Sequence, residues 1–177
     1  MALIRLNTRS APADTFGGGK ILQVQYTQFT ATPDVPVGGA TEVEFTQLSL
    51  DITPASTSSV IKLEAQVFGE FANRALNWNS GWYFRRSGTS LRAPAAGNRG
   101  CSIATSWISH EADSASTPEG VTYGYFDTPN TTSQITYRVA FFSNSSSTFN
   151  LNHTHSDLNS NNYERLVSFI SATEISG

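Results

Sequence analysis

Apolar and polar residues alternate along much of the chain, and the clearest alternation lies between residues 41 and 71. In its second half, an apolar residue or glycine stands at every other position from Ile61 to Phe71. A period of two predicts a β-strand with one dry face and one wet face. In the first half the phase slips by one residue between Phe45 and Leu48, which predicts a bulge or a change of sheet. We expect residues 41–71 to form a hairpin that organises the fold.

A short polar connector, residues 53–59, separates the two halves of this stretch. It contains Pro54, which ends the first strand because proline cannot donate a ladder hydrogen bond. A similar segment, residues 128–133, precedes a second alternating stretch that starts at Ile135. Two strand-turn-strand units of similar chemistry predict a sandwich built of two similar halves.

Other stretches with strand-like patterns bring the expected total to about nine strands, joined by polar turns. Besides the two arms of the hairpin, the expected strands cover residues 20–26, 82–86, 101–109, 121–125, 135–142, 149–151 and 166–175, and the expected loops include residues 30–40, 92–100 and 110–120. Many short strands without a convincing helix predict an all-β fold. We expect an antiparallel, jelly-roll-like β-sandwich over residues 20–177.

Residues 1–19 have a different character and are expected to form an extended N-terminal arm. A small apolar group, Leu3, Ile4 and Leu6, is followed by a polar stretch and three glycines. One interpretation is an unstructured tail. The other is a tether that docks the apolar group into another protein or into copies of the same chain. The apolar run is too short for a signal peptide, so we expect synthesis in a cytoplasm without export by the usual route.

The charge composition excludes several classes of function. The net charge is −3 and only 14% of residues are charged, with no basic stripe. We therefore expect no nucleic-acid partner. No apolar run approaches the length of a membrane span, so no membrane insertion is expected. The one cysteine, Cys101, has no intrachain partner for a disulfide.

His153 and His155 form the one pattern that suggests a metal. Two histidines two positions apart on a strand point to the same face and can grip one ion. A threefold assembly could bring three such pairs to its axis. A cupin-type enzyme site is disfavoured, because the expected spacing to a following glutamate and a third histidine is absent. The alternative is a pair of ordinary histidines at the end of a strand, and we expect neither a metal nor another cofactor.

A group of aromatic residues forms a candidate sugar-binding set, because ring faces stack on the apolar faces of sugars. Its members, with one polar neighbour, are Trp78, Asn79, Trp82, Tyr83 and Trp107. The alternative is that these rings fill the core or a subunit interface. Acidic residues between 111 and 119 fit a solvated loop, and no nucleophile motif is present, so we expect a protein that is not an enzyme.

Four motifs, in their order and spacing, add a family resemblance. They are Gly19-Lys20-Ile21-Leu22-Gln23-Val24, Leu50-Asp51-Ile52-Thr53-Pro54, Phe126-Asp127-Thr128-Pro129 and Ser171-Ala172-Thr173-Glu174-Ile175. Residues 19–176 resemble the compact C-terminal β-sandwich domains of tailed-bacteriophage fibres and related virion appendages, especially those of cyanophages and marine phages. The resemblance implies a homotrimer, an N-terminal arm that attaches to the virion and a distal surface that binds the host.

We therefore expect a structural virion protein, assembled in the host cytoplasm. It would be a short fibre whose exposed loops, 73–79, 92–100 and 110–119, contact a host-surface glycan. Its partners would be copies of itself and, through the arm, other virion proteins. One alternative is an architectural collar, baseplate or head-decoration protein with no host ligand. Others are a monomeric carbohydrate-binding module and an enzyme on the same fold class.

Overall fold

The computed structural model describes residues 19–72, 80–105 and 116–177. These residues form ten β-strands and no helix, which confirms the expected all-β class. The strands are β1 (Ile21–Phe29), β2 (Asp34–Val37), β3 (Thr41–Ile52), β4 (Val60–Phe71), β5 (Ser80–Arg86), β6 (Thr89–Leu91), β7 (Glu119–Asp127), β8 (Ile135–Ser143), β9 (Ser147–Leu151) and β10 (Ser168–Ile175). Within the described ranges there is thus no helix that could span a membrane.

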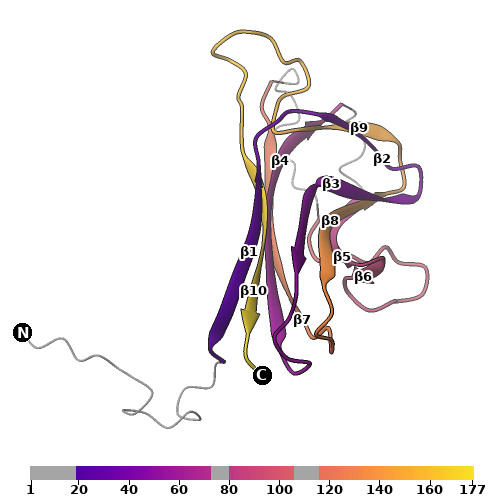
Figure 1. Ribbon diagram of the computed structural model, residues 1–177. Coiled ribbons are helices and arrows are strands. Elements are labelled where there is room, and N and C mark those ends of the chain that lie inside the picture. The colour runs from indigo at the N-terminus through magenta and orange to yellow at the C-terminus, as the bar shows by residue number, and fades with distance from the viewer. Residues whose placement is uncertain (1–18, 73–79, 106–115) are drawn as a thin grey trace, which may run out of the picture.

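The strands form two antiparallel sheets that face each other (Figure 1). The long sheet has the order β1-β10-β4-β9-β2. β7 also pairs with β4, along residues 61–69, on the side opposite β10. The short sheet has the order β3-β8-β5-β6. The expected antiparallel β-sandwich is confirmed.

Each strand pairs with the strand that mirrors it in the sequence. β1 pairs with β10, β2 with β9, β3 with β8, β4 with β7 and β5 with β6. The innermost pair is joined at Ser87 and Gly88, whose φ angles of 43° and 92° fit the two left-handed positions of a tight hairpin turn. The described chain is therefore one long antiparallel hairpin folded over on itself, as in a jelly roll.

The expected hairpin between residues 41 and 71 is wrong. β3 belongs to the short sheet and β4 to the long sheet, so residues 53–59 cross from one sheet to the other. Residues 128–134 cross in the opposite direction, from β7 to β8. The two connectors with similar sequences thus make equivalent connections. Alternation gives the buried face of a strand but not its partner, because strands of facing sheets both turn their apolar sides inward.

Three smaller expectations have mixed outcomes. The phase slip is confirmed, since the pairing of β3 with β8 shifts register between Phe45 and Ser49. The expected loop 30–40 contains β2, an edge strand that tolerates Pro36 because no further strand needs its amide. The expected strand 101–109 is wrong over residues 101–105, where only an isolated bridge joins Ala104 to β5.

Aromatic rings from both sheets meet at Trp82, at the centre of the core. The Trp82 ring lies 4.6 Å from the Phe141 ring and 5.3 Å from the Phe45 ring, both in the short sheet. It also lies 5.3 Å from the Phe149 ring of the long sheet. These rings fill the space between the sheets, where large aromatic side chains contribute most of the buried apolar area.

A buried carboxylate anchors the first connector. Glu174 of β10 has no exposed surface. Its carboxylate accepts hydrogen bonds from the Ala55 amide at 2.7 Å, the Ser59 hydroxyl at 2.6 Å and the Gln23 side-chain amide at 2.6 Å. Burial alone would raise the pKa of Glu174, but these three donors hold it below its usual range. Glu174 therefore joins the connector, β10 and the edge strand β1.

A second buried carboxylate, Asp127, anchors the start of the other connector. Arg86 Nη1 donates to both Asp127 oxygens at 2.8 and 2.9 Å, and the Tyr137 hydroxyl donates at 2.6 Å. Burial raises the pKa of Tyr137, and the hydrogen bond to Asp127 raises it further. This triad joins the end of β7 in the long sheet to β5 and β8 in the short sheet.

Replacing the Glu174 carboxylate is expected to destabilise the fold in a pH-dependent way. Because its pKa is depressed in the folded state, its stabilisation is present above its unfolded pKa and is lost as the pH falls through its folded pKa. Glu174→Gln should lower the free energy of unfolding by about 1–2 kcal/mol at pH 7, with a smaller difference from wild type in acid. Urea unfolding from pH 7 down to pH 3 would measure this.

Glu64→Gln is the matched control, because Glu64 is a half-exposed residue of β4 paired with Lys62. It should leave stability nearly unchanged. Equal losses for the two variants, or a Glu174→Gln loss that does not shrink in acid, would contradict this account of Glu174.

Candidate functional site

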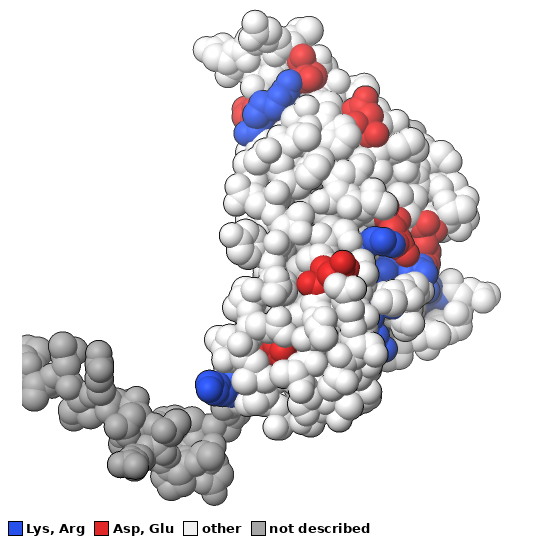
Figure 2. All heavy atoms as spheres, in the orientation of Figure 1, with Lys and Arg blue, Asp and Glu red and all other residues white. Residues whose placement is uncertain are grey.

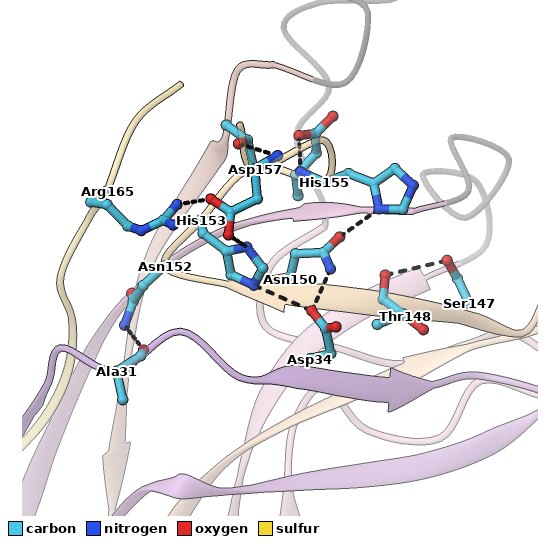
Figure 3. Close-up of polar contacts among 12 residues, drawn as sticks. Ala31, Asp34, Ser147, Thr148, Asn150, Asn152, His153, His155, Asp157 and Arg165 are labelled. Atoms are coloured by element: carbon cyan, nitrogen blue, oxygen red, sulfur yellow. Dashed lines mark hydrogen bonds and ion pairs between the residues drawn. The ribbon is translucent and has the colours of Figure 1, made fainter. Parts of the chain in front are cut away.

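A cluster of polar side chains gathers where β9 ends and residues 152–167 leave the long sheet (Figure 3). We call it the polar junction. Its members are Asp34, Asn150, Asn152, His153, Asp157 and Arg165. The strand ends because Asn152 has a φ of 64°, which turns the chain out of the β conformation.

Asn152 is the structural centre of the polar junction. It has no exposed surface, and its side-chain amide donates to the carbonyl oxygens of Phe29 at 2.9 Å and Ala31 at 3.0 Å. Its side-chain oxygen accepts a bond from the Ser168 hydroxyl at 2.6 Å, and its backbone amide donates to Phe68 at 2.9 Å. One residue thus joins the end of β1, β4 and the start of β10.

His153 lies between two carboxylates. Its Nε2 atom is 3.3 Å from Asp34 Oδ1, and its Nδ1 atom is 3.6 Å from Asp157 Oδ2. Asp157 also forms an ion pair with Arg165. The hydrogen bond from Arg165 lowers the pKa of Asp157, and the positive charges nearby lower it further. His153 thus lies between β2 and the loop after β9.

The strand geometry behind the metal hypothesis is wrong for His153 and His155. The strand stops at Leu151, so the two rings do not share a strand face. His153 is buried against the carboxylates, whereas His155 is exposed and its Nδ1 lies 3.2 Å from Asn150 Oδ1. In the described ranges no three His, Cys, Asp or Glu side chains are grouped closely enough to hold a metal ion.

The structure places two members of the aromatic set away from solvent. Trp82 is 2% exposed within the core, and Tyr83 is fully buried on the opposite face of β5. Tyr83 is covered by Arg92, whose guanidinium carbon is 5.2 Å from the ring centroid, and its burial raises the pKa of its hydroxyl. Neither ring offers a face for stacking on a sugar, which corrects the expectation for these two residues.

The remaining predicted site residues, Trp78, Asn79 and Trp107, lie outside the described residues, as do Leu3, Ile4 and Leu6 of the arm. The neighbouring described segments do meet, because the Trp82 amide donates to the Ala104 carbonyl at 2.7 Å. The roles expected for these six residues therefore stay predictions.

A pocket of about 250 Å³ lies on the outside of the short sheet, beneath the loop that follows β6. We call it the Phe142 pocket. It is lined by Arg92, Ala93, Ala95, Gly97, Arg99, Gly100, Cys101 and Phe142. The loop approaches the Phe142 ring so closely that a Cβ atom at Gly100 would lie 2.3 Å from the ring. Only glycine allows this contact without a shift of the ring.

A belt of ion pairs fixes the inner side of this pocket. Arg92 Nη1 is 2.6 Å from Glu42 Oε1, and Arg85 pairs with both Glu42 and Glu44. Arg138 Nη1 lies 2.7 Å from Glu44 Oε2. Burial would raise the pKa of Glu42, but Arg92 and Arg85 hold it below its usual range. The belt thus fixes Arg92 at the pocket wall.

Arg99 supplies a second guanidinium on the exposed part of the loop. Its Nη1 donates to the Ala96 carbonyl at 3.1 Å, and no carboxylate partner of Arg99 is described. The Arg99 guanidinium beside an aromatic ring suits an acidic, partly apolar ligand, whereas Arg92 is engaged by Glu42. The expected loop 92–100 contains most of this pocket, but Phe142 gave no sequence signal because it lies in a distant strand.

The comparisons with known proteins identify no family for this chain. No family model and no curated protein matches the chain. A structure of infectious bursal disease virus VP2 in a subviral particle is similar at 12% identity and a TM-score of 0.38, over 89% of this chain and 34% of that chain. A structure of the Gx strain of the same virus gives 14% identity and a TM-score of 0.32, over 88% and 43% of the two chains. The chain thus spans about a third of the first, and likenesses this weak carry no argument about function.

Exchanging Asn152 for aspartate is expected to destabilise the fold strongly. Asn152→Asp replaces only the side-chain NH2 group by an oxygen. It nevertheless removes the donor to two carbonyl oxygens and places a negative charge against them. We expect a loss of about 3 kcal/mol in the free energy of unfolding. Asn130→Asp is the control, since Asn130 has a similar φ of 54° but is exposed. Thermal and urea unfolding that show equal losses for both variants would disprove the role assigned to Asn152.

Proposed function

We propose that the protein is a non-enzymatic structural component of a virion, a short fibre of a tailed phage whose sandwich contacts the host surface. Jelly rolls of two sheets occur in viral capsid proteins and in lectins, which supports a role in assembly or binding. The fold alone does not specify function, because unrelated activities share it. The observation that carries the proposal is therefore the Phe142 pocket, together with the family resemblance of residues 19–176.

The chemistry of the Phe142 pocket favours an acidic sugar as its ligand. Arg99 is exposed and its nearest described hydrogen-bond partner is a neutral carbonyl. It is therefore available to bind a carboxylate in a bidentate way. Phe142 is partly buried and borders the pocket. Weak binding by one pocket would be strengthened when several copies are presented together.

The architectural role, as a collar, baseplate or head-decoration protein without a host ligand, remains a second candidate. It is favoured by the long open edge of β1, which is a surface for assembly and not for a sugar. The homotrimer expected from the resemblance stays a prediction. Anchoring through Leu3, Ile4 and Leu6 is likewise proposed from the sequence alone.

Removing the exposed guanidinium should weaken binding to acidic glycans. We expect Arg99→Ala to weaken binding at least about tenfold, since a lost charge-assisted hydrogen bond costs about 1.5–3 kcal/mol. Lys62→Ala is the matched control, because it removes one positive charge from the outer face of the long sheet. A glycan array, followed by titration of the best acidic glycan, would measure both. An array that stays blank for the wild type would favour the architectural role.

Deleting residues 2–16 should leave the sandwich folded but prevent incorporation into the particle. The expectation follows from the apolar group near the N-terminus and from the start of β1 at Ile21. Circular dichroism would verify the fold, and mass spectrometry of purified particles would measure incorporation. Insoluble protein would place residues 1–19 in the core and contradict the proposed boundary.

A further inference from the structure

β1 is a long strand with one open edge. It spans nine residues and pairs with β10 on one side. No strand in the described part of the chain pairs with its other side. Half of the backbone N–H and C=O groups of such a strand point away from the sheet and favour pairing with a further strand.

Apart from β7, the other sheet edges are short, interrupted or covered in the described ranges. β2 has four residues and contains Pro36, and β6 has three residues. β3 is bulged, and side chains of β1 bond to its edge, since Thr27 donates to the Ser49 carbonyl at 2.7 Å and Gln23 donates to the Thr53 carbonyl at 2.8 Å. β7 has nine residues and also pairs on one side alone in the described ranges, but it carries Glu119 and two glycines, whereas Asp127 at its end is buried against Arg86.

β1 lacks charges, prolines and a central bulge, although the side chains of Gln23 and Thr27 bond it to β3. No charged residue or proline occurs from Ile21 to Phe29, and its one register shift lies at the start of the strand. Its apolar side chains are unusually exposed: Leu22 is 40%, Val24 52% and Tyr26 73% exposed. In Figure 2, the margin at which Figure 1 draws β1 shows no charge over most of its length. An unprotected edge of this length normally lies in an interface.

The composition of β1 favours a second copy of the same chain as the occupant. In an antiparallel pair around a twofold axis, each strand meets its own sequence in reverse, so the exposed row with Val24 and Tyr26 faces an identical row. No like charges come together within β1, and Lys20 at its start lies opposite the far end of the partner strand. Cross-strand pairs of aromatic and β-branched residues are among the stabilising ones.

We propose that two copies of this chain associate through antiparallel pairing of their β1 strands, which joins their long sheets into one continuous sheet. The pairing does not depend on the Phe142 pocket or on a host ligand. A twofold pair differs from the expected homotrimer, so the two arrangements are distinguished by solution mass and by cross-linking.

The first test compares lysine variants of the full chain by light scattering behind a sizing column. The wild type should have about twice the mass of one 19.2 kDa chain. Val24→Lys adds a positive charge to each of the two paired strands, in place of an apolar side chain, and should return the mass to that of one chain. Phe126→Lys is the control, because Phe126 is 63% exposed on β7, at the opposite edge of the long sheet, and should stay paired. A single-chain mass for the wild type, or dissociation by Phe126→Lys alone, would overturn the proposal.

The second test locates the axis without relying on a charged variant. In a Cys101→Ser background, a single cysteine is placed at each position from Gln23 to Thr27 in turn, and each protein is oxidised. Twofold pairing predicts disulfide-linked pairs whose yield peaks at one position, since only residues near the axis meet their own copies. A trimeric mass with no such peak would place the interface elsewhere and refute β1 pairing.

Discussion

The mirrored pairing of strands about the turn at Ser87 and Gly88 is the constraint on which the rest of the structure depends. Every described strand pairs with the strand at the mirrored position. Once one pair has formed its hydrogen bonds, the two strands that flank it in the sequence are held close enough to pair with each other. The long hairpin forms two sheets because its two chains cross from one sheet to the other, at residues 53–59 and 128–134. Those crossings are held by the buried carboxylates Glu174 and Asp127, whose hydrogen bonds replace the water that they lose. The core around Trp82 then packs between sheets that are already in register.

Much of this fold could be predicted because alternation is a local property. The burial of every second residue in β4 and β10 follows directly from the apolar pattern, and so does the bulge after Phe45. Pairing is not local, so the sequence predicts a hairpin turn at residues 53–59, although this connector joins two sheets. β2 was missed because four residues with a proline carry too little pattern. Glu174 and Asp127 were not recognised as buried, since a carboxylate in a strand usually lies on the wet face.

The candidate site was less predictable, for a related reason. Trp82 is a large aromatic residue, and the same property that suits it to sugar stacking suits it to the core, which is where it lies. The pairing of His153 and His155 depended on an unbroken strand, and the left-handed conformation of Asn152 breaks it. The loop after β6 was correctly singled out as a connection between strands, but its pocket exists only because Gly100 lets the loop approach Phe142. Such a contact joins residues far apart in the sequence and leaves no periodic signal.

The two surfaces proposed for function lie on different sheets. β1 borders the long sheet, whereas the Phe142 pocket lies on the outer side of the short sheet, and Figure 1 places β1 and the loop after β6 on opposite sides of the molecule. A second copy paired at β1 would extend the long sheet away from the pocket and leave it open in both copies. The pockets would then be held at a fixed separation by a continuous sheet. Rigid presentation of this kind raises the effective concentration of the second site once the first is occupied. An assembly edge and a weak binding pocket on opposite sides of one sandwich therefore reinforce each other without any contact between them.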